Sequence, residues 1–374
     1  MKYIILLTVI VLFVNVNFSL SQNSSPKFGE NFKLQVFLEN YYLKSFNKND
    51  DTLNIAAFAG NSKYMDQFRL NVASIALSYD DNKVRGGFEV MFGDNPHLMA
   101  YPDNEFVRYI GKANFGYHLT EGLWIDIGYI PDPVGCESGK PINNMISSVS
   151  IGGYYQPENF LGFIFSYKMN DKLAFKGYFG NPYTLRFGKN EKSHLGVQVN
   201  WKPIEDLSLT YSNLYGDDTE LYEVHEEWML YNNFVLDYRI TESVHILGQF
   251  DLARQKGVFG DDDRVEIMTS GFLGAKYYLL ENFSVAARYE FFNDESGFRT
   301  GYLIDGRLWS SPDEWQGYGM NMQGLSASLE FIPVDNAYIR AEFRYNETGK
   351  DELVFNRNLD NTRKFLLFTT GLKF

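Results

Sequence analysis

The chain has 374 residues, of which 45% are hydrophobic and 17% are aromatic, and its formal net charge is -13 at pH 7. This amount of apolar surface excludes intrinsic disorder as the main state. The single cysteine, Cys136, excludes a disulfide scaffold, and the negative charge argues against nucleic acid as a partner. The mean hydropathy is nevertheless only -0.28, which is unusual for a chain so rich in aromatic residues.

The first residues have the pattern of a secretory signal peptide. Lys2 precedes an apolar run over residues 4–14, and two small serine residues follow near position 20. This order of charged, apolar and small residues is typical of a cleaved export signal. The alternative is a membrane anchor, which needs about 20 apolar residues, but polar residues interrupt the run too early. We expect residues 1–21 to be the signal peptide and residues 22–374 to be the mature domain.

Further along the chain, apolar and polar residues alternate in runs of about ten, and a period of two is the pattern of a β-strand. In one such run the apolar positions are Leu123, Ile125, Ile127 and Tyr129. Similar runs begin at residues 195, 244 and 337. Each of these strands therefore has one apolar face and one polar face.

Short turns and long polar connections alternate between the strands. The seven short turns lie at 79–83, 119–122, 169–172, 203–206, 240–243, 280–282 and 333–336. The eight long connections lie at 43–67, 92–105, 131–158, 181–192, 215–229, 256–265, 293–317 and 346–363. Sixteen strands joined in this way predict an all-β transmembrane antiparallel β-barrel with short periplasmic turns and long extracellular loops. The alternative is a soluble secreted β-sandwich or propeller.

Two features favour the barrel. Aromatic residues stand beside the short turns, as in the girdle at a membrane interface; they are Tyr117, Trp124, Tyr167, Trp201, Tyr238 and Tyr277. The chain also ends inside its last strand, with apolar residues at alternate positions up to Leu372 and Phe374. We expect these two residues to be the signal that the barrel-assembly machinery reads, and the last strand to close against the first, near residues 33–42.

Three segments resemble a known family. Residues 123–138 (LWIDIGYIPDPVGCES), 196–203 (GVQVNWKP) and 207–216 (LSLTYSNLYG) are similar to the strand and loop patterns of the OmpL-like β-barrel porin family. Cys136 departs from the pattern, which has an aliphatic or aromatic residue there. The resemblance implies a location in the cell outer membrane and a pore, and it brings no catalytic residues with it.

The polar faces of the strands are expected to line a water-filled lumen, because a Lys or Arg facing lipid at mid-bilayer would cost about 2–4 kcal/mol. The candidate lumen and selectivity residues are Arg85, Glu89, Arg108, Lys112, Asp126, Arg288, Glu290, Arg340, Glu342 and Arg344. A ladder of basic residues alone would select anions, but here acidic residues are interleaved. We therefore expect cross-strand ion pairs and weakly selective passage of small polar solutes or ions.

Two of the long connections invite functional hypotheses. The third, 131–158, is the longest and could fold inward as a constriction, with Asp132, Glu137 and Lys140 setting its charge; the alternative is an ordinary surface loop. The fifth, 215–229, is acidic. It could bind cations that bridge to lipopolysaccharide, although a solvated loop without a ligand explains the same composition.

The sequence has no motif of a hydrolase, metalloprotease or nucleotide-binding enzyme, so we expect no catalysis, cofactor or metal. The leading hypothesis is an outer-membrane porin for passive diffusion. The alternatives are a substrate-specific oligosaccharide channel, with Phe37, Tyr178 and Tyr338 as candidate lumen aromatics, and a structural or adhesive barrel acting through its extracellular loops. Expected partners are outer-membrane lipid, lipopolysaccharide and small polar solutes, and the sequence leaves a homo-oligomer open.

Overall fold

Sixteen antiparallel strands, each hydrogen-bonded to its neighbours in the chain, form a closed barrel. The computed structural model of the chain describes residues 29–47, 62, 64–99, 107–131, 133–157, 159–181, 193–217, 228–256, 264–300, 319–349, 355 and 360–374. The strands are β1 (Phe32–Ser45), β2 (Phe68–Asp80), β3 (Val84–Phe92), β4 (Ile110–Thr120), β5 (Leu123–Pro131), β6 (Asn159–Lys168), β7 (Leu173–Gly180), β8 (His194–Ile204), β9 (Leu207–Asp217), β10 (Trp228–Thr241), β11 (Val244–Lys256), β12 (Val265–Leu280), β13 (Phe283–Asp294), β14 (Met320–Val334), β15 (Ala337–Thr348) and β16 (Thr362–Lys373).

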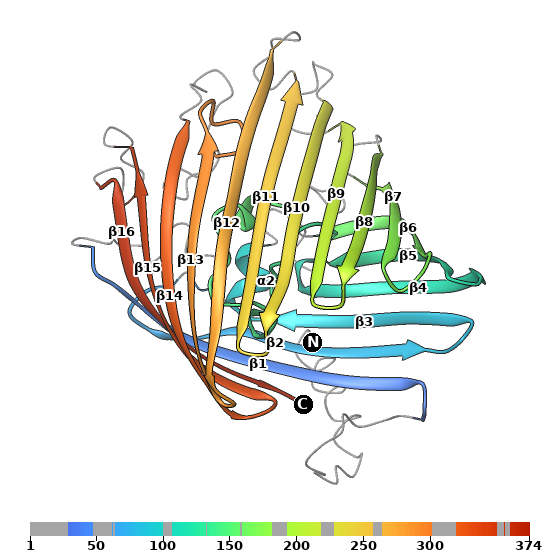
Figure 1. The fold of residues 1–374 in the computed structure, drawn as a ribbon, viewed down its shortest axis with the longest axis horizontal. Helices are drawn as coiled ribbons and strands as arrows, with labels where there is room; N and C mark the ends of the chain where they lie inside the picture. Colours follow the sequence, from blue (N-terminus) through green and yellow to red (C-terminus); the bar gives the residue numbers. More distant parts are fainter. Residues whose placement is uncertain are drawn as a thin grey trace, which may run out of the picture.

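The barrel closes between its first and last strands, as the sequence predicts. β1 pairs with β16 in an antiparallel register that places Leu38 opposite Leu372 (Figure 1). At the end of the chain the backbone N–H of Phe374 donates to the carbonyl of Val36 at 2.8 Å, and the Val36 N–H donates back at 3.2 Å. Every strand therefore has a partner on both sides, and the sheet has no free edge.

The strand count, the seven short turns and the eight long connections of the sequence prediction are all confirmed. The short turns form because polar side chains bind the backbone locally. In the turn between β2 and β3, Asp81 Oδ1 accepts the N–H groups of Lys83 and Val84, both at 2.7 Å. In the turn between β6 and β7, Asn170 Oδ1 accepts the N–H of Leu173 at 2.9 Å.

Among the described residues, helical structure lies only in the long connections. A short helix, α2 (Asp94–Met99), and a 3-10 turn, η1 (Val107–Tyr109), lie between β3 and β4, while η2 (Pro141–Asn143) and η3 (Gly153–Tyr155) lie between β5 and β6. No helix within the described ranges has the length and apolar content to cross a bilayer.

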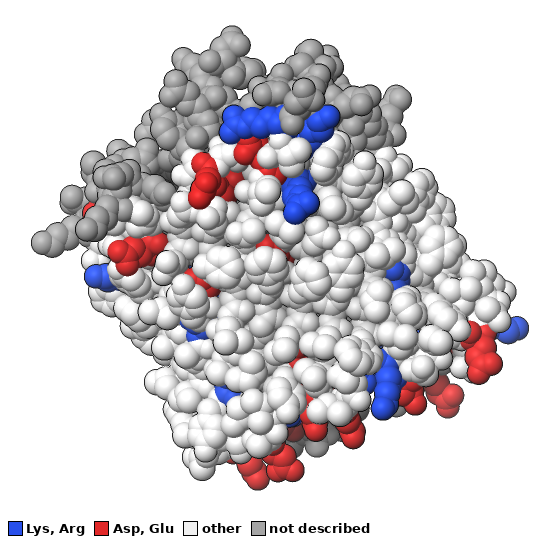
Figure 2. All heavy atoms as spheres, turned by 45° about the horizontal axis from the view of Figure 1, so that its top comes forward, with Lys and Arg blue, Asp and Glu red and all other residues white. Residues whose placement is uncertain are grey.

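The alternation along each strand separates an apolar outer face from an inner face that carries the charges. In β12, Ile267, Leu273 and Tyr277 are exposed, whereas Glu266 and Lys276 are buried. Figure 2 shows the result on the face in view, where uncharged side chains form a broad band and acidic and basic side chains gather mainly towards its two ends. This is the surface that a membrane requires of a barrel.

Four of the six predicted girdle residues are exposed on the outer face, and Tyr238 is half-buried. The four are Tyr117, Tyr167, Trp201 and Tyr277. Trp124 was expected beside them but faces inward, because it is two positions from the inward-facing Asp126 on the same strand. Its ring stacks on His118, with centroids 4.8 Å apart, and Arg85 lies 4.5 Å above its ring centroid.

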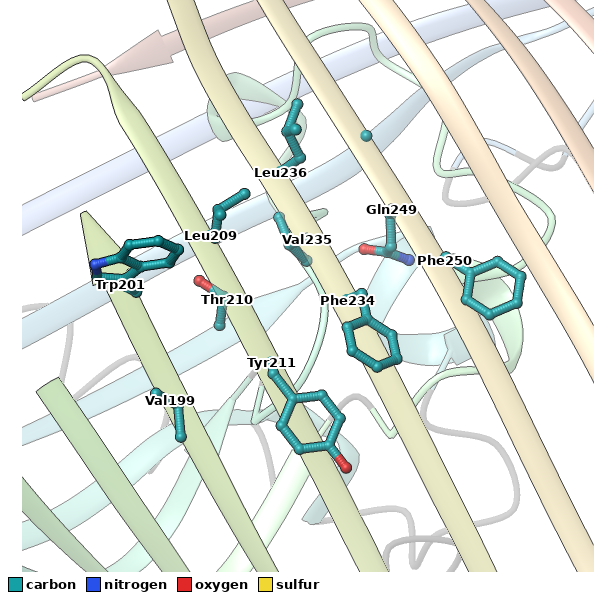
Figure 3. Close-up of a pocket in the computed structure, with 11 residues that line it drawn as sticks. Val199, Trp201, Leu209, Thr210, Tyr211, Phe234, Val235, Leu236, Gln249 and Phe250 are labelled. Atoms are coloured by element: carbon teal, nitrogen blue, oxygen red, sulfur yellow. The ribbon is translucent and has the colours of Figure 1, made fainter. Parts of the chain in front are cut away.

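The outer wall also carries a groove of about 500 Å³ over β8 to β11. Figure 3 shows Trp201, Tyr211, Phe234 and Phe250 pointing outward around it. Gly248 also lines the groove. The groove belongs to the lipid-facing surface and is separate from the interior of the barrel.

Candidate functional site

The described part of the connection between β5 and β6, residues 133–157, lies inside the barrel and is called the inward loop below. The Gly135 N–H donates to Asn233 Oδ1 on β10 at 3.1 Å, and Ser147 Oγ lies 2.7 Å from Thr369 Oγ1 on β16. These strands stand far apart around a closed ring, so one segment can reach the inner side chains of both only from within.

The first part of the inward loop follows the wall from β7 to β11. The carbonyl of Pro133 accepts hydrogen bonds from Tyr178 on β7 at 3.2 Å and from Gln198 on β8 at 3.3 Å. The Cys136 N–H and thiol both donate to Gln249 on β11, at 3.0 and 3.2 Å. This stretch therefore rests on the wall through neutral hydrogen bonds.

A narrow tip, residues 139–143, projects from the inward loop. Its base is closed by Ser138 and Asn144, since the Ser138 N–H donates to Asn144 Oδ1 at 2.7 Å and Asn144 Nδ2 donates to the Ser138 carbonyl at 2.8 Å. Beyond this base, Lys140 forms an ion pair with Glu89 on β3. The tip thus extends across the interior from the rest of the inward loop to β3.

Two further contacts fix the tip. Arg340 Nη1 on β15 donates to the carbonyl of Pro141 at 2.6 Å. Ile142 packs against the buried cluster of Phe37, Val72 and Tyr338. Phe37 and Tyr338 were candidates for an aromatic sugar slide, but both are buried here, so neither presents a ring to an open passage.

The second part of the inward loop covers a cluster of buried charges on β13 and β15. Arg344 is fully buried, and its Nη2 lies 2.6 Å from Glu290 Oε1. Glu290 Oε2 accepts the backbone N–H of Ile151 at 2.7 Å. The side chains of Glu290 and Arg344 meet over the backbone of the intervening strand β14 at Gly324. A Cβ added to Gly324 would approach Glu290 Cγ to 2.7 Å. A glycine at this position therefore makes the ion pair possible.

The same cluster binds the loop backbone directly. The Ser148 N–H donates to Glu342 Oε2 at 2.9 Å, and Arg288 donates to the Ser148 carbonyl at 2.9 Å. Arg288 Nη1 also lies 2.6 Å from Glu137 Oε1. Burial raises the pKa of the Glu137 carboxyl above its usual range, and the Arg288 guanidinium opposes that shift.

The inner faces of β3 to β8 form the less covered side of the barrel, called the open wall below. Arg85 and Lys112 are partly exposed there, and Lys176 is exposed. Arg85 Nε donates to Asp126 Oδ1 at 3.0 Å, and this pair crosses β4 at Gly116, where any Cβ would collide with the Asp126 carboxylate. The passage that the inward loop leaves free must run along this wall.

The structure divides the predicted lumen residues into two groups. Buried beneath the inward loop are Arg288, Glu290, Arg340, Glu342 and Arg344. On the open wall are Arg85, Glu89, Lys112 and Asp126. The first group holds the loop and does not meet open water, so its position argues against a direct role in selectivity.

The remaining predicted residues have separate outcomes. Arg108 was expected on a strand but lies in η1, because the pairing of β3 with β4 ends at Ile110. Leu372 and Phe374 face outward at the end of β16. Asp132 and most of the acidic connection 215–229 lie outside the described residues.

Two functional positions were missed in the sequence. Ser148 lies in a run of the sequence that has the composition of an apolar patch. It nevertheless forms hydrogen bonds with three residues of the strands. Glu330 on β14 forms ion pairs with both Lys276 and Arg340. Its place on the inner face, alternating with Ser326 and Ser328, was the signal that could have identified it.

Comparison with known proteins gives a family and a set of similar structures. Residues 31–374 match the family described as "Putative beta-barrel porin-2, OmpL-like". No curated protein matches the chain. Among solved structures, Salmonella typhi OmpF in complex with daunomycin has a TM-score of 0.61 at 12% identity, covering 92% of this chain and 98% of that one.

Two further structures have the same architecture. An anion-selective porin from Comamonas acidovorans has a TM-score of 0.59 at 8% identity, covering 92% of this chain and 99% of that one. The trimer form of OmpT from Vibrio cholerae has a TM-score of 0.55 at 11% identity, with coverages of 92% and 99%. At these identities the structures establish the fold alone, and the family and fold together support a channel rather than an enzyme. The chain belongs to the OmpL-like family of β-barrel porins and is an outer-membrane porin channel.

Proposed function

We propose that the protein is a passive porin for small polar solutes and ions, narrowed by the inward loop. The observation that carries this proposal is the set of hydrogen bonds from residues 133–157 to strands on several sides of the ring. Sixteen strands enclose a water-filled channel unless something occupies it. The inward loop covers one part of the wall and leaves the open wall for the solute.

The remaining proposals concern export and partners. Residues 1–21 direct export as a signal peptide in a Gram-negative cell, and the barrel-assembly machinery then recognises Leu372 and Phe374. Outer-membrane lipid and lipopolysaccharide surround the apolar outer face. A homo-oligomer is supported only by analogy with the trimer form of Vibrio cholerae OmpT, which shares the fold.

The two other hypotheses have less support. An oligosaccharide channel needs exposed aromatic rings along the passage, but Phe37, Tyr178 and Tyr338 are all buried. An adhesive barrel needs no free passage, whereas the open wall keeps partly exposed polar side chains. Passive diffusion is the function that uses both the loop and the open wall.

Liposome swelling tests this proposal. Vesicles with the purified barrel should swell in small sugars, at rates that fall steadily as the sugar grows, because a passive pore selects by size. Vesicles with heat-denatured protein are the control. Swelling that is faster for one oligosaccharide than for smaller sugars would favour a specific channel, and no swelling would contradict any channel function.

A further inference from the structure

The open wall presents positive charge to the passage, and this observation deepens the proposed porin function. The basic side chains there are partly exposed, since Arg85 keeps 32% of its side-chain surface and Lys140, at the loop tip, keeps 26%. Their acidic partners are nearly closed off, at 5% for Asp126 and 7% for Glu89. A solute in the passage therefore meets the cationic member of each ion pair.

Two lysines add charge outside the ion pairs of the described residues. Lys112 is opposite Glu89 in the register of β3 and β4, but the Glu89 carboxylate pairs with Lys140 instead. Neither Lys112 nor Lys176 has an ion pair with any residue that the structure describes.

The direction of Lys176 is fixed by its neighbours. Tyr178, two positions along the same face of β7, donates to the inward loop, so Lys176 points into the barrel as well. Its charge interacts with those of Arg85 and Asp126. On the open wall and the loop tip, four basic side chains therefore face two buried carboxylates.

The acidic residues on β13 and β15 do not offset this charge. Glu290 and Glu342 are buried beneath the inward loop, where they bind Arg344 and the backbone of residues 148–151. The protein's net charge of -13 thus says little about the field in the passage, because field strength falls steeply with distance and screening.

Asp237, on the inner face of β10, is an exposed acidic side chain, but its Oδ1 lies 2.9 Å from His245 Nε2 and its charge also interacts with those of Arg239 and Lys202. Further exposed acidic residues lie in the short turns. They are Glu121, Asp171, Glu205, Asp206, Glu242, Glu281 and Asp335. Figure 2 shows acidic side chains gathered at the lower edge of the face in view. Lys176 is roughly 16 Å along the strand from Asp171 at about 3.3 Å per residue, whereas screening in physiological salt acts over about 8 Å. The turn carboxylates therefore have little influence at the depth of the lysines.

We infer that the channel prefers small anions, such as chloride, phosphate and short carboxylates, to cations of the same size. The basic residues of the open wall attract anions electrostatically. Lys112, which is partly exposed, and Lys176, which is exposed, supply the part of that attraction that no ion pair among the described residues offsets. This inference rests on the proposed porin function.

Reversal potentials across a planar bilayer test the inference. The full barrel is measured in a KCl gradient near 0.1 M, where the screening length is about 10 Å. Chloride should be more permeant than potassium. The double variant Lys112→Gln/Lys176→Gln should lower the chloride-to-potassium permeability ratio by about two- to fivefold for each charge removed, and Lys176→Glu should lower it further than Lys176→Gln.

Lys172→Gln, in the exposed turn between β6 and β7, is the matched control and should leave the ratio unchanged. A wild-type channel that conducts but prefers potassium, or a double variant with the same ratio as the control, would overturn the anion preference and leave the porin function intact. A folded protein without conductance would overturn both.

Discussion

Arg344 shows how the inward loop is held at the level of single residues. Its guanidinium is wholly buried and faces Glu290 on one side. On the other side it donates to the carbonyl of Val149 at 2.8 Å. Two charges withdrawn from water are tolerated only when each is paired and hydrogen-bonded. The loop backbone therefore completes the environment that these side chains need.

Replacing Glu290 should be costly for this reason. Glu290→Gln keeps the shape of the side chain but leaves Arg344 buried without its carboxylate, and breaking a buried pair in this way costs about 3–5 kcal/mol. Denaturant unfolding of the barrel in detergent measures the loss. Glu281→Gln, in the exposed turn between β12 and β13, should change the free energy of unfolding by less than about 0.5 kcal/mol. Equal stabilities for the two variants would contradict the anchoring role.

The partners of these residues could not be read from the sequence. The interleaving of Arg340, Glu342 and Arg344 predicts cross-strand ion pairs, and such pairs do form between Arg340 and Glu330 and between Arg344 and Glu290. Glu342 instead accepts hydrogen bonds from Ser148, which is 194 positions away. A contact between residues so far apart in the sequence depends on the whole fold. The local sequence pattern therefore cannot predict it.

At the level of elements, the strands were predictable and the inward loop was not. A strand can be recognised from the alternation of apolar and polar residues over about ten positions, which is a local signal. The loop has no period, and its position follows from contacts with β3, β10, β15 and β16. Its length and apolar content were compatible with an inward or a surface position, so the sequence left both open.

The last strand provides a prediction of its own. Deleting Phe374 removes its two backbone hydrogen bonds with Val36, worth about 0.5–1.5 kcal/mol each, and also removes an exposed aromatic ring. The fraction of folded barrel in the outer membrane, read from heat-modifiable mobility on gels, should fall. Lys373→Ala keeps the backbone hydrogen bonds and should fold as the wild type does. Equal yields from both variants would count against Phe374 as an assembly signal.

At the level of the whole molecule, the structure separates the charges that the inward loop covers from the charges that it leaves uncovered. The sequence already accounts for the modest hydropathy, because half of each strand faces lipid and the other half faces inward. It could not show that the inward loop covers Glu290 and Glu342 while leaving Lys112 and Lys176 uncovered. The sequence prediction of weak selectivity rests on the signs along each strand, and the reversal potentials test it against a preference for anions.

We propose that the inward loop sets the width of the channel. The most direct test of this proposal is the single-channel conductance of a variant that lacks residues 139–143. Ser138 and Asn144 already lie within hydrogen-bonding distance of each other, so joining them should leave the rest of the loop in place. We predict a conductance clearly above that of the wild-type channel; a folded variant with unchanged or lower conductance would contradict the account.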